Sequence, residues 1–235
     1  MLVDDDVLID SGSGVGDLTL DEMAQIRHVF LTHSHLDHVA FLPLLVDSIF
    51  ERIEQPIVIH GLPATIQALR EHIFNWAIWP DFAKLPVVNK PVMAYQEHHA
   101  GDVCEVDGRK LELIPMNHIV PTVGYRVESA KGKSFAFTGD TSTNDSFWQA
   151  INRHKSLDLL LLEVAFSNAY EALSNSARHY CSKTMVDDLV KLKLDPQIYL
   201  THHKPEEGDT IIEEIKRLLP QRVIKQLKNN QSFSL

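Results

Sequence analysis

Cysteine is scarce in this sequence: its 235 residues include only Cys104 and Cys181. Two cysteines cannot form the disulfide framework of a small secreted domain, nor can they supply the four thiolates of a structural zinc cluster. A chain of this length with 44% apolar residues can instead be held by one substantial hydrophobic core. The sequence therefore predicts a single globular domain over residues 1–235.

Basic residues are also few, because 22 Lys and Arg stand against 32 Asp and Glu, giving a net charge of −10. Bulk electrostatic capture of nucleic acid needs clustered Lys and Arg, so this composition argues against it. No apolar run is long enough to span a bilayer, and no charged-then-apolar leader opens the sequence. We therefore expect a cytoplasmic protein that does not associate with membranes.

Strand-like and helix-like runs alternate over much of the chain. Strands are predicted at 29–33, 57–61, 157–166 and 197–203, and helices at 37–53, from 62, at 181–194 and from about 210. Three further strand-like runs, LELIPMNH, VGYRVES and SFAFTGD, are separated by turns and predict an antiparallel region. The expected class is α/β or α+β with layered sheets.

Histidine, by contrast, is abundant, with 13 residues, and it is densest in the stretch LTHSHLDH. There His33, His35, Asp37 and His38 directly follow a strand-like run. Solvated loops seldom crowd three imidazoles together, because the rings repel one another once protonated. Imidazole and carboxylate ligands together suit zinc, manganese or iron. The cluster therefore predicts a metal site at the start of a helix.

Three other strand-like runs end on a possible ligand: LELIPMN on His118, SFAFTG on Asp140 and QIYLT on His202. Functional residues often gather at strand ends, because the sheet fixes the backbone while loops stay adaptable. A single histidine in such a place is more often a hydrogen-bonded structural residue than a ligand. Together with the HSHLDH cluster, however, these residues supply enough ligands for two metal ions.

In their order, these motifs resemble those of the metallo-β-lactamase superfamily of binuclear hydrolases. Asp10 matches the first motif, HSHLDH the second, His118 the third, Asp140 the fourth and His202 the fifth. The resemblance covers most of the chain and implies a four-layer αββα sandwich. It also implies two divalent metal ions, with zinc the first choice and manganese or iron the alternatives.

The resemblance implies how the ligands divide between the two ions. One ion would be held by His33, His35 and His118, the other by Asp37, His38 and His202, with Asp140 bridging them. Asp37 would also orient the water between the ions. Counting two divalent cations, two aspartates and one hydroxide leaves about one positive charge, which favours a small anion over a long polyanion.

The segment from Glu163 to His179 is similar to the phosphodiesterase branch, which includes tRNase Z and cyclic-nucleotide phosphodiesterases. In that branch an acidic residue in a strand is followed by a histidine at the start of a helix, and Glu163 and His179 match this pair. MNHIVPTVGYR and LTHHKP look most similar to bacterial phosphodiesterases of this fold. The implied reaction is hydrolysis of 3′,5′-cyclic nucleotides to 5′-monophosphates.

In the implied mechanism a metal-activated water attacks phosphorus and His179 protonates the leaving alkoxide. Polar residues that follow Asp140 are candidates to donate hydrogen bonds to the phosphate, although such residues are also ordinary turn formers. These residues are Thr141, Ser142, Thr143 and Asn144. His203 is expected to face away from the metals, and Lys204 is interpreted as a solvated loop charge.

Three alternatives remain open. The first is a tRNA 3′-end endonuclease of the same branch, which usually carries a basic arm that this sequence does not show. The second is a thioester or lactone hydrolase of the glyoxalase II-like kind, against which Glu163 and His179 argue. The third is a metal-stabilised binding module, whose signature would be a missing ligand, and none is missing.

Two regions lie outside the predicted site. An aromatic loop or lid is predicted at about 75–91, where Trp76, Trp79 and Phe82 would either stack on a base or, more commonly for aromatics, pack against protein. The chain also begins almost at the Asp10 motif, so the usual first N-terminal strand or strands are expected to be lacking. An exposed sheet edge there would invite association, for which a homodimer is the expected form.

Overall fold

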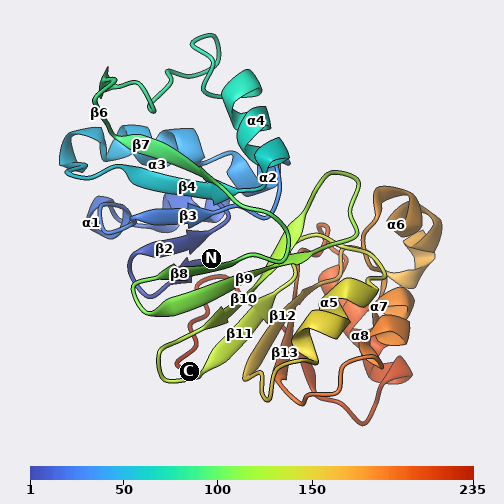
Figure 1. Ribbon diagram of the computed structural model, residues 1–235. Helices are drawn as coiled ribbons and strands as arrows, with labels where there is room; N and C mark the ends of the chain where they lie inside the picture. The colour runs from blue at the N-terminus through green and yellow to red at the C-terminus, as the bar shows by residue number, and fades with distance from the viewer. The chain divides into compact units, whose positions relative to one another are not determined.

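The computed structural model describes residues 1–235, which divide into two compact units, residues 1–99 and residues 100–235. Each unit is built on one large sheet with helices packed on it (Figure 1), and the first unit also contains a two-stranded sheet. The alternation of strands and helices agrees with the predicted α/β or α+β class. Composition predicted a single domain, and it stays a prediction that the two units act as one.

The first unit is built on a five-stranded sheet in the order β1-β2-β3-β4-β7. Only β1 is antiparallel to its neighbour; the other strands run parallel. The strands are β1 (Leu2–Val3), β2 (Val7–Ile9), β3 (His28–Phe30), β4 (Ile57–Gly61) and β7 (Met93–Glu97). Thus β1 and β2 form a short hairpin ahead of Asp10.

The helices of this unit are short. They are η1 (Ser13–Asp17), α1 (Leu20–Met23), α2 (Leu36–Val39), α3 (Leu42–Ser48), η2 (Phe50–Arg52) and α4 (Pro63–His72). The single helix predicted over 37–53 is wrong, since α2, α3 and η2 replace it. Pro43 explains the first break, because proline has no N–H and its ring clashes with the carbonyl four residues earlier. It lies instead in the first turn of α3, as Pro63 does in α4.

The core of the first unit lies between one sheet face and the helices. Apolar residues of β3 and β4, such as Val29 and Ile59, pack there with Leu45 of α3 and Leu69 of α4. Because side chains alternate along a strand, His28, Phe30 and His60 point to the opposite face. The sequence pattern thus gives this sheet two distinct faces.

The aromatic segment contains two short strands, β5 (Pro86–Val87) and β6 (Lys90–Pro91), which pair with each other. Phe82 is buried in the core and Trp79 packs against it. Trp76 is 59% exposed. Protein packing therefore accounts for two of the three aromatic residues considered for base stacking.

The second unit contains a seven-stranded sheet in the order β14-β13-β12-β11-β10-β9-β8. Its strands are β8 (Val103–Val106), β9 (Arg109–Pro115), β10 (Val123–Glu128), β11 (Ser134–Phe137), β12 (Leu159–Glu163), β13 (Gln197–Thr201) and β14 (Ile224–Gln226). Strands β8 to β11 are antiparallel, which confirms the predicted antiparallel region, and β11 to β14 are parallel.

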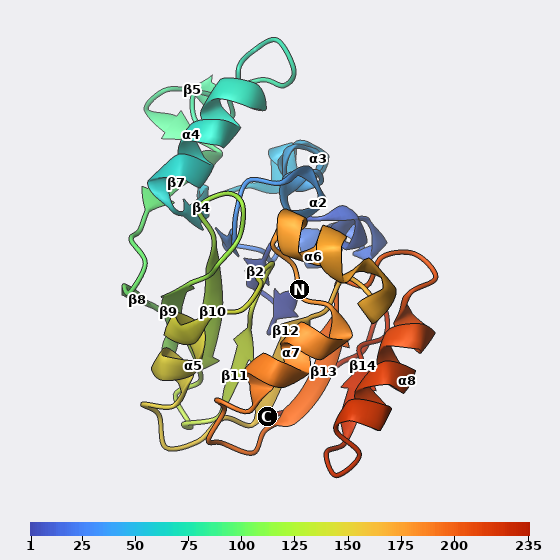
Figure 2. The same ribbon diagram turned by 90° about the vertical axis from the view of Figure 1, so that its right-hand side faces the viewer.

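Helices α5, α7 and α8 lie side by side over the second sheet (Figure 2). The helical segments are α5 (Asp145–Ile151), η3 (Asn168–Tyr170), α6 (Glu171–Ala177), α7 (Ser182–Leu189) and α8 (Gly208–Leu218). Trp148, Met185 and Ile215 of these helices pack against Leu160 and Leu200 of the strands. Helix α7 ends earlier than predicted, whereas α8 begins close to the expected position.

Strand direction in the second sheet determines where its candidate ligands lie. Strand β9 is antiparallel to β10, which is antiparallel to β11, so β9 and β11 run the same way. Strands β12 and β13 continue parallel to β11. The carboxyl ends of these four strands therefore share one edge of the sheet.

None of the helices combines the length and the apolar character that a membrane-spanning segment needs.

Candidate metal centre

In the first unit, the histidine cluster lies where β3 ends. Strands β2 and β3 are parallel, so Asp10 at the end of β2 lies beside the loop that follows β3. Gly12 lets the chain pass close to α2: a Cβ atom there would lie 2.3 Å from the Asp37 carbonyl oxygen. Close backbone approach thus requires glycine at position 12.

A buried hydrogen-bond network fixes two of the imidazoles. His38 donates from Nδ1 to Asp10 Oδ2 at 2.7 Å. The Thr32 hydroxyl donates to the same carboxylate at 2.9 Å, so its lone pair accepts from His33 Nδ1 at 3.0 Å. Both rings thereby carry their lone pair on Nε2. Fixing the tautomer in this way is typical of the groups that support metal-binding histidines.

The remaining two residues of the cluster lie beside these rings. The His33 and His35 ring centroids are 4.6 Å apart in an edge-on arrangement, and His33 and His38 are 4.2 Å apart. The Asp37 side chain is largely exposed, with Oδ2 3.7 Å from His38 Nε2. The structure thus brings together all four residues of HSHLDH that were predicted to bind metal.

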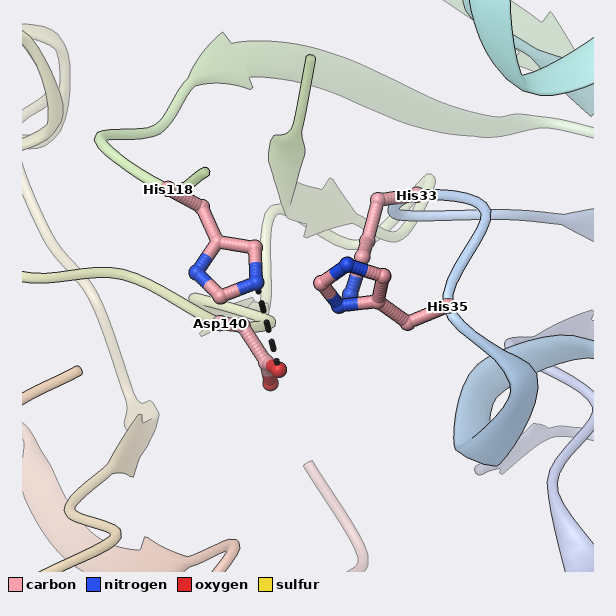
Figure 3. A group of neighbouring side chains, drawn as sticks. All are labelled: His33, His35, His118 and Asp140. Atoms are coloured by element: carbon pink, nitrogen blue, oxygen red, sulfur yellow. Dashed lines mark ion pairs between the residues drawn. The ribbon is translucent and has the colours of Figure 1, made fainter. Parts of the chain in front are cut away.

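In the second unit, His118 follows β9 and is buried. Its Nδ1 donates to the Arg178 carbonyl oxygen at 3.0 Å, and the Arg178 guanidinium donates back to the His118 carbonyl at 2.8 Å. This pair of bonds fixes the ring and leaves Nε2 facing Asp140, as Figure 3 shows; the figure also draws His33 and His35.

Asp140 presents one oxygen to each of two histidines. Its Oδ2 lies 3.9 Å from His118 Nε2, and its Oδ1 lies 3.4 Å from His202 Nδ1. Both separations exceed a good hydrogen bond. Two ligands about 2.0–2.2 Å from one tetrahedral zinc ion lie about 3.4 Å apart, so the pairs have the spacing of metal ligands. Asp140 thus directs one carboxylate oxygen toward each histidine, an arrangement suited to binding metal.

Glu163 and His179 form a buried pair at the same sheet edge. His179 Nδ1 donates to Glu163 Oε1 at 2.9 Å, and the Thr141 backbone N–H donates to the same oxygen at 3.1 Å. Burial raises the pKa of Glu163 to about 7. Burial alone would lower the pKa of His179, but the hydrogen bond to Glu163 and the carboxylate charge raise it overall. The His179 ring lies 4.9 Å from that of His118 and 5.3 Å from that of His202.

The residues after Asp140 are mostly engaged by the protein itself. The Thr141 hydroxyl accepts from the Asn117 N–H, and the Ser142 hydroxyl donates to the Asn117 carbonyl. The Asn144 side chain caps α5, while the Thr143 carbonyl accepts from the Asn117 amide. Their predicted hydrogen bonds to phosphate stay a prediction.

His203 donates from Nδ1 to the Val164 carbonyl at 2.7 Å, so it faces away from Asp140 as expected, and His202 is the residue that faces Asp140. Two supporting residues were not predicted from the sequence. Thr32 and Arg178 hydrogen-bond to candidate ligands, yet only Thr32 carried a signal, since the tripeptide LTH recurs at His33 and His202. Arg178 acts through its backbone carbonyl at φ 52°, which no sequence pattern indicated.

Replacing Asp10 with asparagine is expected to weaken metal binding about 10- to 100-fold, the usual cost of losing a group that supports a ligand. The asparagine amide cannot replace the carboxylate as the hydrogen-bond acceptor of both His38 and Thr32. The tautomer of His38 is then no longer fixed. Competition with a chelator measures this affinity. Asp21→Asn, at an exposed aspartate of the same unit, serves as control. Equal affinities of the Asp10 variant and the parent would contradict the role.

Sequence comparison finds relatives with related names. A probable 3′,5′-cyclic-nucleotide phosphodiesterase of Yersinia pestis is 27% identical over 146 residues, covering 60% of this chain and 39% of that protein. A ribonuclease Z of Kineococcus radiotolerans is 30% identical over 139 residues, covering 55% of this chain and 40% of that protein. The chain thus spans less than half the length of either relative.

The crystal structure of unliganded yeast PDE1 superposes with a TM-score of 0.78 at 20% identity, covering 89% of this chain and 69% of that one. A metallo-beta-lactamase fold protein of Bacillus subtilis superposes with a TM-score of 0.76 at 19% identity, covering 97% of this chain and 87% of that one. These likenesses confirm the predicted fold. The family model described as beta-lactamase superfamily domain matches residues 6–203. As the order of its motifs indicated, this chain belongs to the beta-lactamase superfamily.

Proposed function

We propose that this protein is a metal-dependent phosphodiester hydrolase that opens 3′,5′-cyclic nucleotides to 5′-monophosphates. The observation that carries the proposal is the buried Glu163–His179 pair beside Asp140, because hydrolysis of a phosphodiester expels a poor alkoxide leaving group that needs a proton. The names of the relatives support the same reaction class.

The proposed ligand sets are those implied by the superfamily. His33, His35, His118 and Asp140 would hold one divalent ion, and Asp37, His38, Asp140 and His202 the other. Their mixture of imidazole and carboxylate suits zinc, with manganese and iron as alternatives. Divalent ions bound there would lower the pKa of a coordinated water to about 7 and polarise phosphoryl oxygens.

The protein's own groups have separate tasks in this reaction. Glu163 binds Nδ1 of His179 and so directs the proton on Nε2 toward the leaving oxygen. The carboxylate also stabilises the protonated ring, which is the form that acts as an acid. Asp37, with its exposed side chain, is proposed to orient the attacking water.

Ribonuclease Z activity is the second candidate, because relatives of that name match the chain at similar identity. The excess of 32 acidic over 22 basic residues favours a small anion instead. Absence of bulk nucleic-acid binding and formation of a homodimer accordingly remain proposals.

The test compares four substrates on the purified protein with its metal content measured: 3′,5′-cyclic AMP, bis(p-nitrophenyl) phosphate, precursor tRNA and an acyl thioester. We expect turnover of the first two and none of the thioester. Metal-loaded protein that hydrolyses neither small phosphodiester would overturn the proposal. Cleavage of precursor tRNA without turnover of cyclic AMP would favour the second candidate.

A further inference from the structure

Lys204 lies at the same edge of the second unit as the Glu163–His179 pair. It follows His202 and His203 after β13, and its backbone N–H donates to the Ala165 carbonyl at 3.0 Å. Its own carbonyl accepts from the Glu207 N–H at 3.1 Å. The main chain that carries this lysine is therefore fixed to the segment that follows β12.

The ring of Phe166 lies beside both the lysine and His179. Lys204 Nζ stands over this ring, 6.0 Å from its centroid, and the His179 ring meets it edge-on at 5.9 Å. Phe166 is 8% exposed and the Lys204 side chain is half-buried. The positive charge of Lys204 also acts on the His179 imidazole, where it partly opposes the Glu163 hydrogen bond that raises the His179 pKa. Lys204 and His179 thus border one aromatic ring.

Lys204 has no carboxylate partner in the structure. By contrast, Lys133 and Lys183 of the same unit are paired with Asp158 and Asp187, each at 2.7 Å. Those pairs lie on exposed surface, where a partner is worth little. A half-buried ammonium held beside an aromatic ring keeps more of its attraction for an anion, because less water surrounds it.

We propose that Lys204 is a specificity-determining residue that binds a non-bridging oxygen of the substrate phosphodiester. The proposal rests on the phosphodiesterase function proposed above and adds to it a protein cation that recognises the phosphate charge. A lysine acts on phosphate as a point charge with three rotatable donors, so it does not require a fixed bidentate geometry. A neutral thioester or lactone would gain nothing from this contact.

The test compares Lys204→Met with Lys204→Arg in the metal-loaded protein. Loss of one charge-assisted hydrogen bond is expected to raise KM for bis(p-nitrophenyl) phosphate about tenfold, with a smaller change in kcat. Arginine keeps the charge and is expected to return KM to within about threefold of the parent. Lys183→Met, at a paired and exposed lysine of the same unit, is the matched control and should leave KM unchanged.

Equilibrium binding of AMP, measured by calorimetry on the same proteins, separates this inference from the proposed function. We expect a Kd about tenfold higher for Lys204→Met than for the parent. A parent that hydrolyses the phosphodiester, with neither KM nor Kd changed by Lys204→Met, would overturn the inference and leave the function standing. A parent without turnover, whose AMP binding still depends on Lys204, would overturn the function and leave an anion site at Lys204.

Discussion

Replacing Asp140 with alanine is expected to lower phosphodiester turnover by more than about 100-fold and to reduce the bound metal. Its two oxygens face His118 and His202, so one substitution removes a ligand from each proposed ion. Loss of a group that merely supports a ligand costs up to about 100-fold in affinity or activity, and loss of a shared ligand should exceed that. Metal analysis after gel filtration and steady-state kinetics measure the two effects.

Unfolding is the competing explanation for such a loss, and thermal stability distinguishes it. Asp140 is 2% exposed, so without metal its carboxylate is buried away from water, which lowers the stability of the folded protein. The metal-free alanine variant should therefore melt at or above the temperature of the metal-free parent. The parent should gain stability when zinc is added, because a ligand that binds the folded state raises its melting temperature, and the variant should gain less.

Asp195→Ala is the control for the Asp140 substitution. Asp195 belongs to the same unit, its side chain is fully exposed, and it makes only a 3.4 Å ion pair with Arg222. Its variant should keep the parental metal content and kcat. Parental metal content and turnover in Asp140→Ala would contradict the bridging role.

The sequence predicted well where the candidate ligands lie at the strand ends, for a physical reason. Buried strands such as β12 and β13 are short apolar runs, and a polar residue that ends such a run stands out. Parallel pairing then brings Glu163 and His202 to one edge without further information. The prediction worked because local pattern and strand direction together determine these positions.

Contacts between distant segments could not be read in this way. The Arg178 carbonyl reaches His118 across 60 residues of sequence, and the Phe166 ring links Lys204 to His179 only after folding. Lys204 consequently looked like an ordinary loop charge. The helix predicted over 37–53 failed for the opposite reason, since its apolar spacing was correct but Pro43 ended the hydrogen-bonding pattern locally.

Replacing His179 with alanine should leave the metal content unchanged and slow the reaction by about 10²- to 10⁴-fold for a substrate with an alkoxide leaving group. No proposed ligand is removed, but the proton donor to the leaving oxygen is lost. The loss should be much smaller for bis(p-nitrophenyl) phosphate, because p-nitrophenolate is a far weaker base than an alkoxide and departs without a proton. The ratio of the rate losses on the two substrates therefore distinguishes a general acid from a residue that only supports the fold.

His154→Ala supplies the matched control for this comparison. His154 Nε2 meets Glu112 Oε2 at 2.8 Å, so the protein contains a second His–Glu pair of similar length, which is more exposed and includes no proposed ligand. His154→Ala removes a comparable hydrogen bond between histidine and glutamate, but it removes no proposed proton donor. Equal losses on both substrates in the His179 variant, or an unchanged rate on cyclic AMP, would remove His179 from the mechanism.

The dependence of kcat on pH gives an independent check on the same role. Glu163 raises the pKa of His179, and an acid works only while it is protonated. Turnover of cyclic AMP should therefore fall as pH rises through this raised pKa, and His179→Ala should lose that decline. Glu163→Gln keeps the shape of the partner but removes its charge, so the decline should begin at lower pH. An unchanged profile in Glu163→Gln would mean that the decline reports another group, because no other carboxylate is hydrogen-bonded to the His179 ring.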